Sequence, residues 1–472
     1  MFSSTRDDQQ DPDYIYYNGT IISNRTGLNN NGIELPNPEC RFLETRDVPI
    51  IRDASKYNFS IIRFTLNGPN RDLPLFIPQI RYGKFQPVAT NVNLTIYSIT
   101  LQLTVSYVVG GTPYTETFDT VQPLYHTTET LNAPVPSVDS VITGNQNVAS
   151  RYYWYYTYQH WLDVLNTAFQ SAWSYAGGTI LDQLGNTVQT DGFQAQLATW
   201  WGGLGTGLPV PTLTTAPPVM KWDPSTLRFS LYADTFGFGG ADRVSATPQP
   251  LLPQPPYAPG DTVSESYRLW FNSNLYGMFA NFLNEYDNLA TNKSNEIIIR
   301  SDMNDNVFRE LTLASPPTVI RTYWVMTQDF PSTGTLWSPV ENIVFTSNLL
   351  PLVNEAQGEP IKFGESNIGE GNGATQSAFA PIITDVALAQ DYAHSYKEFI
   401  NYTPQAEYRL ASFQRSATPI NSIDVQVFWR CRLDGQIYPV QLFNGSSVGI
   451  KCMFRRRGVF DYPHPAKGGI DV

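Results

Sequence analysis

The sequence has few cysteines, few positive charges and no long apolar run. Its three cysteines, Cys40, Cys431 and Cys452, are an odd and sparse set, which argues against a disulfide framework. No CxxC pair occurs, so cysteine supplies no zinc site. No run of about 18 apolar residues is present, so we expect no transmembrane anchoring. Residues 1–8 lack the apolar core of a secretory signal, so we expect a protein that is not secreted.

The charge balance is acidic. The chain has 30 Lys and Arg against 42 Asp and Glu, a net charge of −12. Strong nucleic-acid binding requires many clustered cations, so we expect no strong nucleic-acid binding by this acidic chain. One basic cluster stands out, made of Lys451, Arg455, Arg456 and Arg457. We interpret it as a solvated or inter-subunit patch; contact with a packaged genome is the alternative, and the sequence does not say which way the cluster faces.

Catalytic and metal-binding motifs are missing as well. Residues 202–207 have the glycines of a phosphate loop but not its Lys. Residues 302–306 lack the glycine of an EF-hand, and Leu313 stands where its bidentate Glu would be, which leaves an irregular calcium site as a minor alternative. The four histidines are far apart. We therefore predict no enzyme, no cofactor and no metal, with a carbohydrate-processing enzyme as the alternative that two distant carboxylates would allow.

Period-2 patterns dominate what is present. In residues 423–433 the apolar side chains occupy the odd positions, which is typical of a half-buried strand, and Asp434-Gly435 then predicts a tight hairpin turn. Residues 57–66 and 95–107 also indicate strands. Together with the 33 glycines and 35 prolines of the whole chain, these strands favour a mainly β fold, a single jelly-roll β-sandwich core with a large inserted middle region.

Two segments have helical periodicity instead. Apolar residues recur at spacings of three and four and predict an amphipathic helix over 152–175, ended by Gly177 and Gly178: Tyr158, Trp161, Leu162, Leu165, Phe169 and Trp173. A shorter helix is predicted over 274–286. The run that leads into the first helix is wholly aromatic: Tyr152, Tyr153, Trp154, Tyr155 and Tyr156. We interpret this run as a packing seam and interaction patch, with a sugar-binding platform as the alternative.

These patterns divide the chain into four parts. Residues 1–40 are polar and predict an N-terminal arm. Residues 41–150 are expected to form the first part of the jelly roll, and residues 321–472 its second part. Between them, residues 151–320 are expected to hold the helix and an inserted, projecting region. No repeat of 20–50 residues is visible, which argues against propellers and solenoids.

A family resemblance is spread over short segments along most of the chain rather than one motif: residues 59–66, 75–80, 152–160, 166–168, 269–272, 275–276, 406–410, 427–429, 439–440 and 450–456. These segments resemble the penton-type (minor) capsid proteins of virophages, Polintons and Polinton-like DNA viruses. The resemblance implies a jelly roll that stands upright in the shell, five copies that close an icosahedral vertex, an insertion that points outward, and no active site.

Together these lines predict a structural capsid protein of the virion that forms a pentameric vertex capsomer, the penton. The expected partners are four further copies in a homo-pentamer, neighbouring major capsid proteins and internal cement proteins, with assembly in the host cytoplasm or nucleus. An aromatic, weakly charged β chain exposes apolar surface that a closed ring would bury. Two alternatives stay open: another shell protein (major capsid or cement), or a carbohydrate-binding or carbohydrate-processing β protein.

Overall fold

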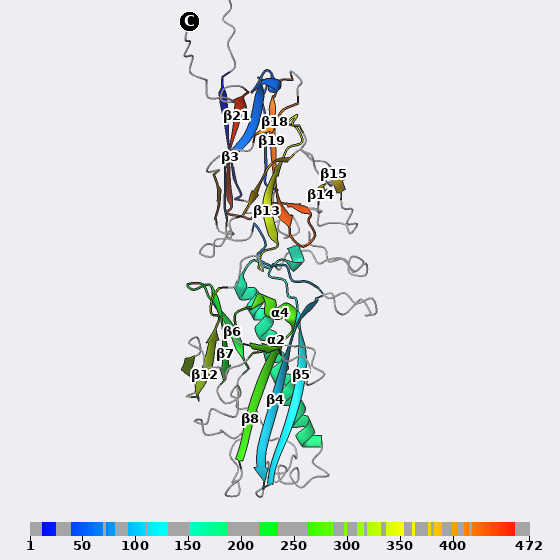
Figure 1. Ribbon diagram of the computed structural model, residues 1–472, viewed down its shortest axis with the longest axis vertical. Coiled ribbons are helices and arrows are strands. Elements are labelled where there is room, and N and C mark those ends of the chain that lie inside the picture. Colours follow the sequence, from blue (N-terminus) through cyan, green and yellow to red (C-terminus); the bar gives the residue numbers. More distant parts are fainter. Residues whose placement is uncertain are drawn as a thin grey trace, which may run out of the picture.

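The computed structural model describes residues 12–24, 39–68, 72–80, 93–109, 112–130, 151–186, 217–234, 262–282, 284–286, 297–299, 309–315, 319–331, 337–353, 361–363, 376–378, 382–388, 399–403, 410–414 and 418–457. Within these residues the protein is mainly β, as the sequence predicted. The strands belong to two units that lie end to end in an elongated molecule (Figure 1). We call them the sandwich unit, at the top of Figure 1, and the helix-covered unit, below it.

The sandwich unit is built from two sheets. The five-stranded sheet has the order β1 (Tyr14–Ile22), β21 (Ser447–Arg456), β3 (Tyr57–Asn67) and β17 (Phe399–Tyr402), with β18 (Ala411–Ser412) also on β3. The seven-stranded sheet has the order β15 (Gln376–Ala378), β14 (Ile361–Phe363), β20 (Ile437–Pro439), β19 (Ser422–Cys431), β13 (Val340–Thr346) and β16 (Ile382–Ala387), with β2 (Arg41–Thr45) on β19. The rings of Phe64 and Phe345 meet between the sheets, with centroids 4.9 Å apart.

The helix-covered unit also has two sheets. One has the order β5 (Thr112–Tyr125), β4 (Leu94–Val109), β8 (Thr262–Phe271), β10 (Ile297–Ile299) and β9 (Asn284–Tyr286). The other has the order β11 (Arg309–Ser315), β12 (Val319–Thr327), β7 (Arg228–Asp234) and β6 (Val219–Asp223). Helix α2 (Tyr158–Asn186) packs on β4, β5 and β6, and the short helix α4 (Ser273–Met278) contacts β4 and β8.

The expected strands are present, and the predicted hairpin is confirmed. β19 and β20 are antiparallel, and Gly435 turns between them with φ of +69° while its N–H donates to the Cys431 carbonyl at 2.8 Å. However, β19 is not simply half-buried. Phe428 and Asp424, on its expected polar side, are buried as well. Phe428 packs with Val344 and Ile437 in a small cluster on the other face of the sheet.

Both helix boundaries differ from the prediction. Residues 151–153 form a 3₁₀ turn, and α2 begins only at Tyr158 and continues past Gly177 and Gly178 to Asn186. A glycine costs a helix only about 1 kcal/mol relative to alanine, so packing on a sheet overrides it. The second helix ends at Met278. It does not reach residue 286, because Asn281 adopts a positive φ of 80° that an α-helix cannot contain and residues 284–286 pair as strand β9.

The division of the chain also needs correction. Residues 14–22, expected in an arm, form β1, which pairs with β21 along its whole length. Residues 94–125 were expected in the jelly roll, but β4 pairs with β8 in the helix-covered unit. Residues 323–327, expected in the second part of the jelly roll, likewise pair with β7 there. Period-2 alternation shows that a segment is a strand, but several sheets offer an apolar face, so the pattern does not show which sheet the strand joins.

Candidate functional site: the joint between the units and the basic end of β21

Three segments connect the two units: residues 72–80, 151–157 and 337–340. The first two meet as an antiparallel bridge between Phe76 and Tyr155. The Tyr155 N–H donates to the Phe76 carbonyl at 2.8 Å, and the N–H groups of Leu75 and Phe76 donate to the Tyr155 carbonyl at 2.8 and 3.1 Å. The chain thus crosses between the units through paired backbone, which we call the joint.

The aromatic run 152–156 lies at this joint and serves both cores. Tyr153, Trp154 and Tyr156 are buried in the core of the sandwich unit, whereas Tyr155 is buried in the core of the helix-covered unit. The Trp154 ring meets Trp429 of β19 at 5.4 Å between centroids. Tyr152 is half-buried, and its hydroxyl accepts from the Asn93 side chain at 3.2 Å. Neighbouring residues that point into different cores make the run a seam between them.

A sugar platform requires an exposed aromatic face. Trp154 is only 3% exposed, and Tyr155 and Tyr156 are buried as well. A glycan could reach none of these three rings without separation of the units. The geometry therefore favours packing over glycan binding for the run.

Two charged residues at the joint were not singled out by sequence analysis. Asp72 is 2% exposed and Arg151 is 7% exposed. Asp72 accepts hydrogen bonds from the Phe443 N–H at 2.8 Å and from the Ser446 hydroxyl at 2.7 Å. Burial raises the pKa of Asp72, and these hydrogen bonds and the charge of Arg151 oppose that rise. The signal that could have revealed Asp72 is its position directly before the apolar stretch 73–78.

Arg151 is held by aromatic rings. Its guanidinium carbon lies 4.7 Å from the Phe443 ring centroid and 5.7 Å from that of Trp154. Burial lowers the pKa of Arg151, while Tyr156 and Asp72 raise it. Asp72 and Arg151 thus fix the segment 443–446, which leads into β21, against the joint. Within the described residues, Nε and Nη2 of Arg151 have no hydrogen-bond partner, so this buried charge depends on its ring contacts and on the nearby charge of Asp72.

Two histidines surround Tyr155. The His126 ring stacks on the Tyr155 ring at 5.0 Å, and its Nε2 lies 2.8 Å from the Tyr152 carbonyl oxygen. Burial lowers the pKa of His126 from 6.5 to about 4. His160, in the first turn of α2, meets the Tyr155 ring edge-on at 4.7 Å, and its Nε2 lies 2.7 Å from the Thr127 carbonyl oxygen. His126 therefore stays neutral at the joint near pH 7.

The three arginines of the basic cluster lie at the C-terminal end of β21, and Lys451 lies midway along this strand. Arg457 donates to the Phe413 carbonyl at 2.9 Å and to the Tyr57 carbonyl at 3.3 Å. Arg456 forms an ion pair with Asp13 at 3.8 Å. The Lys451 ammonium lies 5.0 Å from the centroid of the Tyr16 ring. Two of the four cations therefore hold the end of β21, and Lys451 and Arg455 lie half-exposed on the outer face of its sheet.

The described part of the chain offers little else for chemistry. The three cysteines are free and buried, and burial raises the pKa of each thiol. Within the described residues, no group of three or more His, Cys, Asp or Glu side chains could hold a metal ion. No described helix is long and apolar enough to span a bilayer. Residues 202–207, 302–306, His394 and His464 lie outside the described residues.

The described residues form a β-sandwich joined to a second β unit through buried aromatic residues. Comparison with known proteins identifies the family to which this chain belongs. The family model "Sputnik minor capsid protein V18/19" matches residues 15–456, so the chain belongs to this family of minor capsid proteins. The protein is therefore a structural component of the virion.

The chain is also similar to individual proteins and solved structures. The "Uncharacterized protein V18" of Sputnik virophage is 30% identical over 174 residues, which are 37% of this chain and 90% of that protein. A chain of the Sputnik virophage structure solved by cryo-electron microscopy is similar in fold, with a TM-score of 0.61 and 22% identity, over 96% of this chain and all of that chain. A weaker likeness, with a TM-score of 0.44 and 13% identity, is to the mavirus penton protein, over 94% and 99% of the two chains.

Proposed function

We propose that this minor capsid protein forms a pentameric vertex capsomer of an icosahedral virus and acts without catalysis. The observation that carries the proposal is the match of the minor capsid family model to residues 15–456, nearly the whole described chain. A family-wide match over both units indicates that both serve one structural task. The homo-pentamer would contact neighbouring major capsid proteins and internal cement proteins, after assembly in the host cytoplasm or nucleus.

The two units suggest a division of this task. The sandwich unit contains strands from both ends of the chain and would stand in the shell. The helix-covered unit, which lies between residues 75 and 337, would be the inserted part that projects from it. The joint, with buried Asp72, Arg151 and the run 152–156, would hold the projection at a fixed angle to the shell. Lys451 and Arg455 would lie in contacts between copies.

The purified full-length chain provides the direct test. Native mass spectrometry and negative-stain images should show closed five-membered rings at micromolar protein, alone or with shell proteins of the same virus. A chain that stays monomeric under all of these conditions would contradict the proposal.

Position in the shell is tested separately. A vertex protein is rare in the particle, so a stained gel of the virion should show far fewer copies of this chain than of the major shell protein. A copy number equal to that of the main shell protein would instead favour the alternative of a major capsid or cement role. Retention on a glycan array, unchanged when Trp154 is replaced, would argue for sugar binding elsewhere on the surface.

A further inference from the structure

The five strands of one sandwich sheet carry no acidic residue. Neither Asp nor Glu occurs in β1, β3, β17, β18 or β21. The same strands contain Arg63, Lys451, Arg455 and Arg456, although the whole chain has a net charge of −12. The remainder of the protein is therefore more negative than the total, and this sheet is a positive surface on an acidic molecule.

Three of these four cations, Arg63, Lys451 and Arg455, lie on the outer face of this sheet, whereas Arg456 forms an ion pair with Asp13 just before β1. Along β21, alternate residues Val448, Ile450, Cys452 and Phe454 belong to the sandwich core. Lys451 and Arg455 have the opposite parity, and so point away from the core. Lys451 pairs with Arg63 of β3, which is exposed. Within the described residues, no ion pair reaches Arg63 or Lys451, so their charge remains available to a partner.

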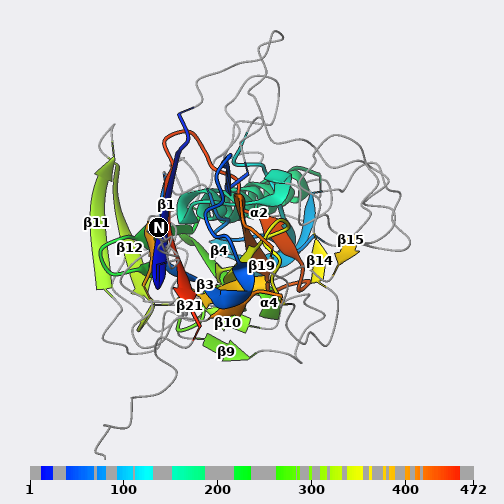
Figure 2. The same ribbon diagram turned by 90° about the horizontal axis from the view of Figure 1, so that it is seen from above.

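Lys451 also leans towards the edge of the sheet. Its ammonium lies over the ring of Tyr16, on the neighbouring edge strand β1. Tyr16 is 52% exposed and stacks in parallel with Tyr14 at 6.4 Å. Ile22, at the end of the same strand, is 65% exposed. Positive charge and exposed apolar area thus coincide along β1, which lies beside β21 when the molecule is viewed from above (Figure 2).

The backbone of β1 offers hydrogen bonds along this edge. The Arg456 N–H donates to the Asp13 carbonyl at 2.9 Å, and the Ser23 N–H donates to the Ser446 carbonyl at 2.8 Å. In an antiparallel ladder, alternate residues face the partner strand, so the odd-numbered residues bond β21. The backbone groups of Tyr16, Asn18 and Thr20 therefore point away from β21, and no further described strand pairs with β1.

This edge also lacks the usual protection against strand pairing. β1 is nine residues long, contains no charged residue and no proline, and pairs with β21 without a register shift. Behind it, Ile15, Tyr17 and Ile21 pack on the sandwich core but are only partly buried. The core is thus incompletely covered at β1, and a neighbouring molecule could bury the side chains that remain partly exposed.

We propose that the outer face of the five-stranded sandwich sheet, together with the free edge of β1, is one half of the contact between copies of this chain. The acidic surface of the next copy supplies the other half. The inference rests on the proposed ring, whose interface it identifies. Two such faces brought together would place Arg63 and Lys451 against their own counterparts, and like charges repel. The contact is therefore head-to-tail, the type that closes rings.

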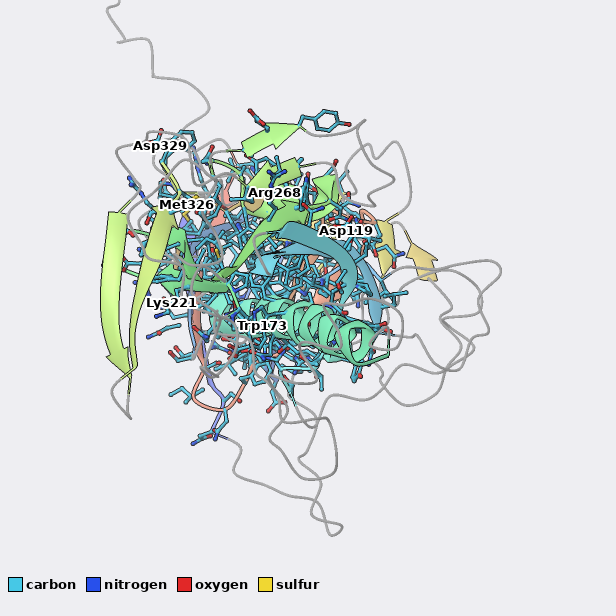
Figure 3. All side chains as sticks on the ribbon, turned by 90° about the horizontal axis from the view of Figure 1, so that it is seen from below. Asp119, Trp173, Lys221, Arg268, Met326 and Asp329 are labelled. Atoms are coloured by element: carbon cyan, nitrogen blue, oxygen red, sulfur yellow. The ribbon has the colours of Figure 1, made fainter. Side chains whose placement is uncertain are left out.

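The first test reverses charge. We expect the double variant Arg63→Glu/Lys451→Glu to raise the protomer concentration needed for half-assembly by about tenfold or more, because two attractions become repulsions. The matched control is Lys221→Glu in β6 of the helix-covered unit. Lys221, labelled in Figure 3, also lies over a tyrosine ring, that of Tyr232, at 4.4 Å. This control should assemble like the unchanged protein.

The second test blocks the strand edge. Thr20→Pro removes an N–H that points away from β21, so the ladder within the protomer stays complete. We expect Thr20→Pro to weaken assembly and its control Thr20→Ala, which keeps the N–H, to leave it unchanged. Circular dichroism and melting curves of the protomers identify any variant that fails to fold, and the double charge variant then decides the question.

Sedimentation or native mass spectrometry over a range of protein and salt concentrations measures the outcome. Rings that form equally well in all variants would overturn the inference but leave the proposed function intact. Intact rings with lost retention on single-stranded DNA would overturn it too, and would assign the positive face to the genome. An unchanged protein that never forms rings would remove the proposed function itself, and the inference with it.

Discussion

The sandwich unit and the helix-covered unit differ in how far apart in sequence their most extensively paired strands lie. In the sandwich unit, β1 pairs with β21, so Tyr14 lies opposite Arg455 across almost the whole length of the chain. In the helix-covered unit, β4 pairs with β5, the next strand in sequence, and helix α2 follows soon after. Pairing of near neighbours has a lower loop-closure cost than pairing of distant segments. We therefore expect the helix-covered unit to form first and the sandwich unit to close around its base.

The comparison also separates the roles of aromatic residues. In the helix-covered unit, Phe76, Trp161 and Trp337 form a tight ring cluster, with Phe76 4.8 Å from Trp161 and 5.7 Å from Trp337. In the sandwich unit, Trp429 stacks on Tyr438 at 4.9 Å and meets Trp154 from the joint. Each core thus has its own buried tryptophan cluster, and aromatic residues of the joint contact both clusters.

The largest expected effect comes from replacing a buried tryptophan in each core in turn. Trp161→Ala and Trp429→Ala should each cost about 3–5 kcal/mol of unfolding free energy, because both rings are fully buried. If the units are separate cooperative bodies, Trp161→Ala lowers the melting temperature of the helical circular-dichroism signal and Trp429→Ala does not. A single shared transition in both variants would show that the joint couples the two cores completely.

The next prediction concerns the buried Asp72 at the joint. Asp72→Ala should destabilise the sandwich unit by about 3 kcal/mol, since it leaves the Phe443 N–H and the Ser446 hydroxyl without their acceptor and removes a charge that favours the cationic form of buried Arg151. Urea denaturation monitored by tryptophan fluorescence measures this loss. Asp223→Ala is the control: its carboxylate accepts only local bonds from Ser225 and Thr226 in an exposed turn, so a small change is expected.

Acid should weaken the joint through His126. Its pKa is about 4 when folded and 6.5 when free, so the unfolded chain takes up the proton first as pH falls. With respect to His126, the free energy of unfolding is highest above pH 6.5 and decreases as pH falls towards 4. Below pH 4 this contribution changes no further, and the full decrease is about 3 kcal/mol. The groups that face this ring are Tyr152, Tyr153, Tyr155 and His160.

Melting curves between pH 7.5 and 4 measure this effect. His126→Gln removes the titration, so the difference in slope between the variant and the unchanged protein reports on His126 alone. His160→Gln serves as the comparison, since that residue is half-exposed. Equal pH slopes for the unchanged protein and His126→Gln would refute the prediction.

The smallest predicted effect belongs to the attachment of α2. The Asn166 side chain donates to the Met220 carbonyl at 2.9 Å and accepts from the Met220 N–H at 2.7 Å, which ties α2 to β6. Asn166→Ala should cost about 1–2 kcal/mol and should lower the stability of the helix-covered unit only. Hydrogen exchange of the Met220 amide is the most direct measurement. Unchanged protection there would mean that packing alone fixes the helix.

The sequence predicted local features well where one physical signal dominated. Alternation over 95–107 marked β4, and Tyr97, Ile99 and Leu101 are indeed buried together. The Asp434-Gly435 pair predicted the hairpin after β19 because few other residues tolerate a positive φ. The end of α2 was wrong, since Gly177 and Gly178 oppose a helix only weakly.

The candidate site was predicted in part. The run 152–156 was recognised as a seam because five consecutive aromatic residues must find cover, yet the sequence could not show that Trp154 and Tyr155 enter different cores. Asp72 and Arg151 were missed, because a lone charge beside apolar residues has no periodicity to reveal it. His126 was noted only as an isolated histidine, since its stacking on Tyr155 depends on folding.

The amino-acid sequence by itself determined that this chain is mainly β, acidic and rich in aromatic residues, and that it resembles minor capsid proteins. Those properties depend on composition and on side-chain alternation, which are local. Only the tertiary structure decided that β4 and β5 leave the sandwich, that residues 14–22 form its edge, and that the cations gather on a sheet without acids. Sheet membership is decided by contacts between segments hundreds of residues apart, and no local pattern encodes which partner a strand will choose.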